Sequence, residues 1–412
     1  MAIIGYDMIR KLTIENYKSI EKTSLNFEEI NVLIGKNGAG KTTLISVVNM
    51  LMKLANGANI NALVNDVAPF GGEFYNANSS SRHARFELVV QTPSKELYDY
   101  SFSVAFGDKK RSTNELGPAF YIDNESLYKA KSEANPKKMI FQRTGEDTSI
   151  EIQSDDGIGK MPLNVDPRVL VLSSFAQNDA KLVAQALGSY SIIWMDSLQP
   201  VSEFEIVSSN TPNLGTIDGV AVSLYLKNQD LFNDAMNAIK SIIPGFTSPE
   251  ITNINDSVSS RSKEGQERKK VTNYIVSWSD SHYSRSYGIS RMSLSGGNNR
   301  VIYLILSLYN CEASSCFVAE EIENGMHLSR IAKLIDQMRM IVKNRKIQLF
   351  FTTHNHLILD DLLPKEIIFT RLGANGSVYT RLTETKEYTD VKNDLGRAPR
   401  STELVNSGLL FG

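Results

Sequence analysis

The sequence of 412 residues lacks the features that would tie it to an oxidising compartment or to a strongly charged partner. Its two cysteines, Cys311 and Cys316, are too few for a disulfide framework, and their spacing is not that of a zinc or redox pair. With 44 Lys and Arg against 46 Asp and Glu, the formal net charge is −2. This balance excludes a globally basic nucleic-acid binder, although it allows a local basic patch.

Long apolar runs and long repeats are also missing. No uninterrupted apolar run approaches the ~20 residues that a membrane-spanning helix needs. The first residues carry neither the basic region nor the long apolar region of a secretory signal. The absence of sustained heptads excludes long coiled-coil arms. We therefore expect a cytoplasmic protein with no membrane partner.

The composition is that of an ordinary globular protein, with 42% hydrophobic and 22% charged residues. The length predicts two lobes or one large elaborated domain. Apolar periodicity predicts alternating helices and strands at both ends of the chain and a mixed insertion between them. Strands are expected at 12–17, 30–34, 271–278, 283–289, 316–319 and 347–352, an antiparallel meander at 85–152, and helices at 41–54, 169–193, 220–243, 301–309 and 329–342.

The strongest motif is GKNGAGKT at residues 35–42, which matches the P-loop pattern G-x-x-x-x-G-K-[ST]. It lies between a predicted strand and a predicted helix, which is the context that the motif requires. Glycines let the backbone turn so that successive N–H groups point at phosphate oxygens, and the following helix adds its positive end. We expect Lys41 to reach the β- and γ-phosphates and the Thr42 hydroxyl to ligate Mg²⁺. The expected ATP-binding residues of this loop are Asn37, Gly38, Ala39, Gly40, Lys41, Thr42 and Thr43.

Three further motifs follow the P-loop. Residues 294–297 (LSGG) precede a predicted helix, whose N-terminus suits an anion. Residues 317–321 (FVAEE) form a short apolar strand that ends in two carboxylates. Residues 350–354 (FFTTH) form another apolar strand with a histidine at its tip. Taken alone, each of these is a common pattern, but their order along the chain is not.

In this order the motifs resemble those of ABC-type ATPases of the SMC, Rad50 and RecF branch, which also share the opening IENYKS at residues 14–19. Residues 320–327 (EEIENGMH) look like the stand-alone AAA-type members that accompany effectors in bacterial anti-phage defence operons, such as PARIS or Septu. The resemblance covers the first ~55 and last ~130 residues, and the middle of the chain only in outline.

The resemblance implies a role for each matching residue. Glu320 would hold Mg²⁺, Glu321 would be the catalytic carboxylate that activates water, and His354 would contact the γ-phosphate. Ser295 and Gly297 would contact ATP held by a second subunit. The implied cofactors are ATP and Mg²⁺. The implied partners are at least one further copy of the chain and a separately encoded effector.

The chain departs from the family pattern at several positions. Glu320 stands where Asp is usual, which predicts a slower rate or an altered metal preference, because Mg²⁺ requires near-ideal octahedral geometry. After the signature glycines the usual Gln is replaced by Asn298 and Asn299, a mild change. The glutamine of the Q-loop is not identified, with Gln91 and Gln177 as candidates.

Basic clusters leave DNA open as a partner. The run at 261–270 reads either as a DNA-phosphate contact or as a solvated hairpin tip, because two glutamates interrupt it. Arg82, Arg85 and the turn at 109–111 carry the same ambiguity.

The leading hypothesis is an ATPase whose composite sites gate an assembly in phage defence or DNA maintenance. The alternative is an oligomeric scaffold that ATP locks with little or no hydrolysis. A fused nuclease is not expected, because only 58 residues follow His354 and Asp390 and Asp394 do not form a clustered two-metal site. A transporter ATPase is not expected, because about 250 residues separate the P-loop from the signature, too many for that compact layout.

The predicted fold class is α/β: an ABC-type P-loop NTPase with an antiparallel β-subdomain and a compact helical insertion. We expect residues 1–165 to carry the P-loop and the β-subdomain, and residues 166–245 to form the helical lobe. Residues 246–412 would complete the ATPase domain with the signature (LSGG, 294–297), the Walker B strand (FVAEE, 317–321) and the switch histidine, His354.

Overall fold

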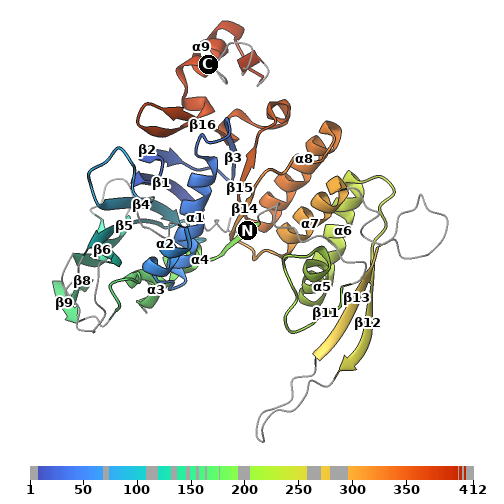
Figure 1. Ribbon diagram of the computed structural model, residues 1–412, viewed down its shortest axis with the longest axis horizontal. Coiled ribbons are helices and arrows are strands. Elements are labelled where there is room, and N and C mark those ends of the chain that lie inside the picture. The colour runs from blue at the N-terminus through green and yellow to red at the C-terminus, as the bar shows by residue number, and fades with distance from the viewer. Residues whose placement is uncertain are drawn as a thin grey trace, which may run out of the picture. The chain divides into compact units, whose positions relative to one another are not determined.

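The structure of the chain is a computed structural model, shown in Figure 1. It divides into two compact units, which we describe separately. The first comprises Met1–Ile192, Ala313–Val318 and Arg345–Gly412, and the second Ile193–Glu312 and Ala319–Asn344. The structure describes residues 8–67, 74–107, 119–130, 137–144, 149–154, 157–162, 165–175, 177–193, 205–257, 271–278, 296–397, 399–400 and 403–404.

A six-stranded sheet carries the P-loop. β3 pairs in parallel with β15 on one side and with β16 on the other, and β16 and β17 form an antiparallel hairpin. All residues of β3, β14 and β15 are buried, which is typical of strands covered on both faces. In sheet order the strands are β10 (Tyr190–Ile193), β14 (Cys316–Ala319), β15 (Gln348–Thr353), β3 (Ile30–Ile34), β16 (Ile367–Gly373) and β17 (Gly376–Arg381).

An eight-stranded antiparallel sheet forms the rest of the β-structure of the first unit. It confirms the predicted meander, because β4 to β8 follow one another as neighbours. Alternate residues of β4 face a core in which the Phe86 and Phe102 rings stack at 5.0 Å. In sheet order the strands are β2 (Ile20–Asn26), β1 (Met8–Tyr17), β4 (His83–Gln91), β5 (Leu97–Gly107), β6 (Ala119–Ala130), β7 (Lys138–Thr144), β8 (Ser149–Ser154) and β9 (Gly157–Pro162).

The helix after the P-loop is confirmed. It begins at Lys41 and buries an apolar stripe that includes Leu44, Val48 and Leu51, and it packs against α3 and α4. The helices and short 3₁₀ turns of the first unit are α1 (Lys41–Ala55), α2 (Ile60–Val67), α3 (Val171–Ser174), α4 (Asn178–Gly188), η3 (His356–Asp361), η4 (Pro364–Glu366), η5 (Leu382–Glu384) and α9 (Lys386–Leu395).

The prediction of one helix over 169–193 is wrong. The segment forms two helices, α3 and α4, and then the strand β10. α4 ends at Gly188, and the residues that follow (SYSII, 189–193) include aromatic and β-branched types that favour a strand. Both helices lie in the first unit, whose first segment extends to Ile192.

The second unit is mainly helical. Figure 1 shows α5, α6 and α7 together, and each packs against the other two. The three-stranded antiparallel sheet of this unit has the order β11-β13-β12. The elements are β11 (Val207–Ser208), α5 (Ile217–Lys227), α6 (Gln229–Ile242), β12 (Glu250–Ser257), β13 (Val271–Ser277), α7 (Gly296–Asn310) and α8 (Leu328–Arg345).

The predicted single helix over 220–243 is also wrong, because it is interrupted at Asn228. The backbone of Asn228 is extended, and its side chain accepts a hydrogen bond from the Leu231 N–H at 3.1 Å. This is an N-cap, so α6 starts as a separate helix after α5. In the sequence, an asparagine within the periodic apolar pattern of 220–243 could have indicated this helix boundary.

The remaining predicted elements agree with the structure to within a few residues. The strand at 316–319 matches β14, and the strand at 347–352 is β15 shifted by one residue. The strand predicted at 283–289 lies outside the described residues. Among the helices that the structure describes, none is long and apolar enough to cross a membrane.

Candidate functional site

The P-loop connects the carboxyl end of β3 to the first turn of α1. Gly38 and Gly40 have positive φ angles of 75° and 108°, conformations that favour glycine. Lys36, Asn37 and Gly38 are exposed at the apex of the loop. Gly40 is the N-cap of α1 and supplies no side-chain cap, and the first turn of the helix contains no acidic residue. The amides at this end of the helix are therefore suited to an anion.

Lys41 lies against the inside of the loop. It is only 6% exposed, and its Nζ donates to the carbonyl oxygens of Gly35 at 2.7 Å and Lys36 at 3.0 Å. A buried ammonium held by two carbonyls places positive charge beside the amides of the helix end. Thr42, the next residue, is exposed and presents a hydroxyl oxygen, the ligand type that Mg²⁺ prefers. These residues fit a nucleotide phosphate with its Mg²⁺.

The described residues contain no group of three or more His, Cys, Asp or Glu side chains that could hold a metal ion. The metal of a P-loop site needs no such group, because Mg²⁺ there takes few protein ligands and completes its shell with water and phosphate oxygens. Asp390 and Asp394 lie on α9 and form no such group.

Strand register brings His354 to the P-loop. β15 pairs in parallel with β3, and Thr353 lies opposite Ile34, the last residue before Gly35. His354 directly follows Thr353, so it leaves the sheet at the level of the loop. On the other side of β3, Thr370 of β16 contacts Gly35 so closely that a Cβ on this glycine would lie 2.0 Å from the Thr370 carbonyl oxygen.

Two residues of β17, Ser377 and Tyr379, lie against the loop and were not predicted. The Tyr379 hydroxyl donates to the Gly40 carbonyl oxygen at 2.6 Å. Both side chains approach the position that a Cβ on Gly40 would take. They are about 340 residues away in sequence and belong to no motif, so only the pairing of the strands could have revealed them.

Glu320 and Glu321 directly follow β14 in the chain, as the Walker B interpretation requires. Both are half-buried. Glu321 has a φ angle of 48°, a left-handed conformation that is uncommon outside glycine and is often found at functional sites. Its Oε2 accepts a hydrogen bond from Asn324 Nδ2 at 2.5 Å. This contact of Asn324 was not predicted from the sequence.

Of the signature motif, Gly296 and Gly297 begin α7, whereas Ser295 lies outside the described residues. Gly297 is buried, and a Cβ there would lie 2.4 Å from the Gly325 carbonyl oxygen. The glycine thus lets the start of α7 approach the segment after Glu321 within the second unit. Close packing alone therefore requires glycine at 297, whatever its contact with nucleotide.

The other candidate residues that the structure describes mostly take part in hydrogen bonds, caps or ion pairs within the chain. Gln91 accepts a hydrogen bond from Arg10 Nε at 2.7 Å, and Gln177 is the N-cap residue of α4. Arg85 forms an ion pair with Glu87 at 2.6 Å. The basic clusters at 109–111 and 261–270 lie outside the described residues.

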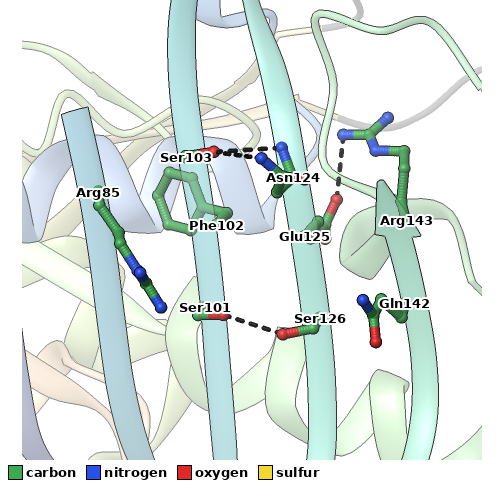
Figure 2. A pocket seen from close by; sticks show the side chains of 9 residues that line it. All are labelled: Arg85, Ser101, Phe102, Ser103, Asn124, Glu125, Ser126, Gln142 and Arg143. Atoms are coloured by element: carbon green, nitrogen blue, oxygen red, sulfur yellow. Dashed lines mark hydrogen bonds and ion pairs between the residues drawn. The ribbon is translucent and has the colours of Figure 1, made fainter. Parts of the chain in front are cut away.

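A polar pocket lies on the antiparallel sheet, apart from every predicted motif. Figure 2 shows its floor, where hydroxyl and amide side chains of neighbouring strands bond to one another. Ser101 and Ser126 are 2.9 Å apart, and Asn124 Nδ2 lies 3.3 Å from Ser103 Oγ. At one end, Arg143 donates to Glu125 at 3.1 Å.

Glu125 ties this sheet to α3. Its carboxylate is fully buried and accepts hydrogen bonds from the Tyr100 hydroxyl at 2.9 Å and from the N–H groups of Val171 at 2.7 Å and Leu172 at 2.9 Å. Burial raises the pKa of Glu125, and the Arg143 charge opposes this effect. The carboxylate is thus a buried cap for the first turn of α3.

Replacing Glu125 by Gln should lower the free energy of unfolding by about 2 kcal/mol, because an NH₂ group then replaces one of the two acceptor oxygens and faces hydrogen-bond donors. Chemical unfolding measures the change. Glu87→Gln is the matched control, since this exposed ion pair with Arg85 contributes about 0.5 kcal/mol at most. Equal losses in the two variants would contradict the structural role of Glu125.

Comparison with known proteins finds two family models that match segments of the chain. A model of the AAA ATPase domain matches residues 8–156, and a model described as "AAA domain, putative AbiEii toxin, Type IV TA system" matches residues 225–360. None of the curated proteins matches the chain in sequence.

Among solved structures, the chain is similar to the SMC head domain from Thermotoga maritima (12% identity, 90% of this chain and 98% of that chain, TM-score 0.45). It is also similar to an SMC head bound to the C-terminal winged-helix domain of ScpA (12% identity, 90% and 96%, TM-score 0.49). A third similar structure is a Pyrococcus furiosus SMC head bound to the C-terminal domain of ScpA (10% identity, 94% and 99%, TM-score 0.45). TM-scores below 0.5 at these identities say nothing about function.

The chain has an α/β P-loop fold, and its segments 8–156 and 225–360 match models of AAA-type ATPase domains. The loop between β3 and α1 has the P-loop sequence, with positive φ angles at Gly38 and Gly40.

Proposed function

We propose that the chain binds ATP at the P-loop of its first unit and hydrolyses it with Mg²⁺. The observation that carries this proposal is the arrangement of the loop: the buried ammonium of Lys41 beside the start of a helix that has no acid in its first turn. Both family matches are to ATPase domains, which supports the same activity.

In the proposed reaction each of these groups has a distinct task. Lys41 and the first amides of α1 bind the phosphates, and the Thr42 hydroxyl and Glu320 hold Mg²⁺. Bound Mg²⁺ neutralises charge on the phosphate oxygens. Glu321 orients the water that attacks the γ-phosphate, while His354 contacts that phosphate.

The wider role that we propose is gating of an assembly in the cytoplasm. Ser295 and Gly297 of one copy would contact the ATP of another copy, so that a homo-oligomer closes on ATP and loosens after hydrolysis. A separately encoded effector would read this change, in phage defence or DNA maintenance. The order of the motifs supports this role, as does the family description that names a toxin–antitoxin system.

A second candidate function is an ATP-locked scaffold with little hydrolysis. The conformation of Glu321 favours it, because the carboxylate is bonded to Asn324 at 2.5 Å and its backbone is left-handed. The Asn324 contact holds this carboxylate in one orientation, and turnover is slow if that orientation does not direct an oxygen at the attacking water. The two functions share ATP binding and differ in turnover.

Replacing Lys41 by Ala should weaken ATP binding about 100-fold, because the variant loses a charge-assisted contact to phosphate. Equilibrium titration with a fluorescent ATP analogue measures the dissociation constant. Lys36→Ala is the matched control: it removes an exposed lysine from the same loop, and we expect a change of about twofold or less. If the two variants bind ATP equally well, the phosphate site is not at this loop.

A further inference from the structure

The β16–β17 hairpin fixes the last peptide of the P-loop. The Tyr379 hydroxyl donates to the Gly40 carbonyl oxygen at 2.6 Å, and the same oxygen accepts the Leu44 N–H of α1 at 3.2 Å. Both acceptor positions of this carbonyl are thereby used, one by the helix and one by the hairpin. The hairpin bond defines the direction in which the carbonyl points.

The direction of the Gly40 carbonyl also determines where an N–H of the phosphate cradle points. The peptide between Gly40 and Lys41 is planar and trans, so its carbonyl and the Lys41 N–H point in opposite directions. The Lys41 N–H is one of the first amides of α1, which have no acceptor within the helix. The Tyr379 hydroxyl holds the Gly40 carbonyl toward β17. The Lys41 N–H, on the opposite side of the same peptide, is therefore directed away from β17.

A second contact braces the same loop through Ser377. Its N–H donates to the Ser19 carbonyl oxygen at 2.6 Å, and its Oγ lies 2.7 Å from Ser19 Oγ. Ser19 Oγ in turn donates to Thr43 Oγ1 at 3.3 Å. A series of hydroxyls thus runs from β17 to the first turn of α1. Glycine at position 40 leaves the space that this approach needs, because a Cβ there would lie 2.2 Å from Ser377 Oγ.

We propose that Tyr379 is a positioning residue for ATP: it holds the Gly40–Lys41 peptide so that the Lys41 amide is aimed at the phosphates before nucleotide binds. The side chain suits this task, because it is 5% exposed and therefore restricted to one orientation. Burial raises the pKa of Tyr379, so the hydroxyl keeps its proton and remains a donor at neutral pH. This inference deepens the proposed function and rests on ATP binding at the P-loop.

Tyr379→Phe tests it, because the change removes the donor and keeps the ring. We expect the dissociation constant for the Mg²⁺ complex of a non-hydrolysable ATP analogue to rise about fivefold, the value of one hydrogen bond. The KM for ATP should rise similarly, with kcat within about twofold of wild type, because the loop is formed once nucleotide is bound.

Tyr98→Phe is the matched control. Tyr98 is a fully buried tyrosine of the same unit, and its hydroxyl oxygen lies within hydrogen-bond distance of two carboxylates, Asp179 at 2.6 Å and Glu96 at 3.1 Å. This variant also loses a buried hydroxyl. The midpoint temperature of thermal unfolding without nucleotide should therefore be lower than in the wild type for both Tyr98→Phe and Tyr379→Phe. Only Tyr379→Phe should change the affinity for the analogue.

The outcomes separate this inference from the proposed function. Equal affinities in the two variants would overturn the role of Tyr379. A wild type that binds ATP without turnover would overturn the proposed hydrolysis, and the two dissociation constants would still decide the role of Tyr379. A wild type that binds no ATP would overturn both. If Tyr379→Phe does not fold, Ser377→Ala replaces it, with an expected rise of about threefold in the dissociation constant.

Discussion

Glu321→Gln should lower the rate of ATP hydrolysis by about 1,000-fold and leave ATP binding unchanged. A glutamine side chain has the size of glutamate but cannot accept the proton of the attacking water. The binding groups at the P-loop are untouched by this change, so the variant should accumulate with ATP bound. If copies of the chain close on ATP, the molecular mass should rise with ATP and stay high in the variant.

Phosphate release measures the rate of hydrolysis, and light scattering measures the molecular mass with and without ATP. Asp336→Asn is the matched control, because Asp336 is an exposed carboxylate on α8 of the same unit. We expect this variant to hydrolyse ATP at the wild-type rate. A Glu321→Gln variant that hydrolyses ATP at the wild-type rate would show that another group activates the water.

Gly40→Ala should lower the free energy of unfolding by about 4 kcal/mol and abolish measurable ATP binding. Two effects add at this residue. The φ angle of 108° is strained for any residue with a Cβ. The added Cβ would also lie 2.2 Å from Ser377 Oγ and 2.8 Å from the Tyr379 hydroxyl. Relief requires β17 or the loop to move, and either movement disrupts the phosphate cradle.

Gly38→Ala separates these two effects. Gly38 also has a positive φ, 75°, but a Cβ there would have nothing within 4 Å. Only the backbone strain remains, so we expect a loss of about 1 kcal/mol. Chemical unfolding of both variants measures the difference. Equal losses in the two glycine variants would contradict the close packing of β17 against the loop.

The parts of the fold that sequence predicted well are encoded locally. The P-loop is complete within residues 35–42, and the apolar runs of β3, β14 and β15 are buried on both faces, so a short segment is enough to recognise each of them. Strands β4 to β8 alternate clearly enough to predict a meander.

The parts that sequence missed depend on distant residues or on single caps. β10 reads as the end of a helix until its place at the edge of the sheet beside β14 is known. Asn228 divides α5 from α6 through one side-chain hydrogen bond. Tyr379 donates a hydrogen bond to Gly40, which is 339 residues away in the sequence. A single tyrosine in a C-terminal strand does not indicate such a contact. Local pattern cannot report such pairs, because they exist only after the strands have paired.

ATP hydrolysis at the P-loop is tested by phosphate release from MgATP by the purified wild-type chain, measured beside Lys41→Ala. We expect steady turnover by the wild type that requires Mg²⁺ and is lost in the Lys41→Ala variant. Turnover that persists in Lys41→Ala would contradict it, and so would a wild type that binds ATP and releases no phosphate, which would favour the scaffold.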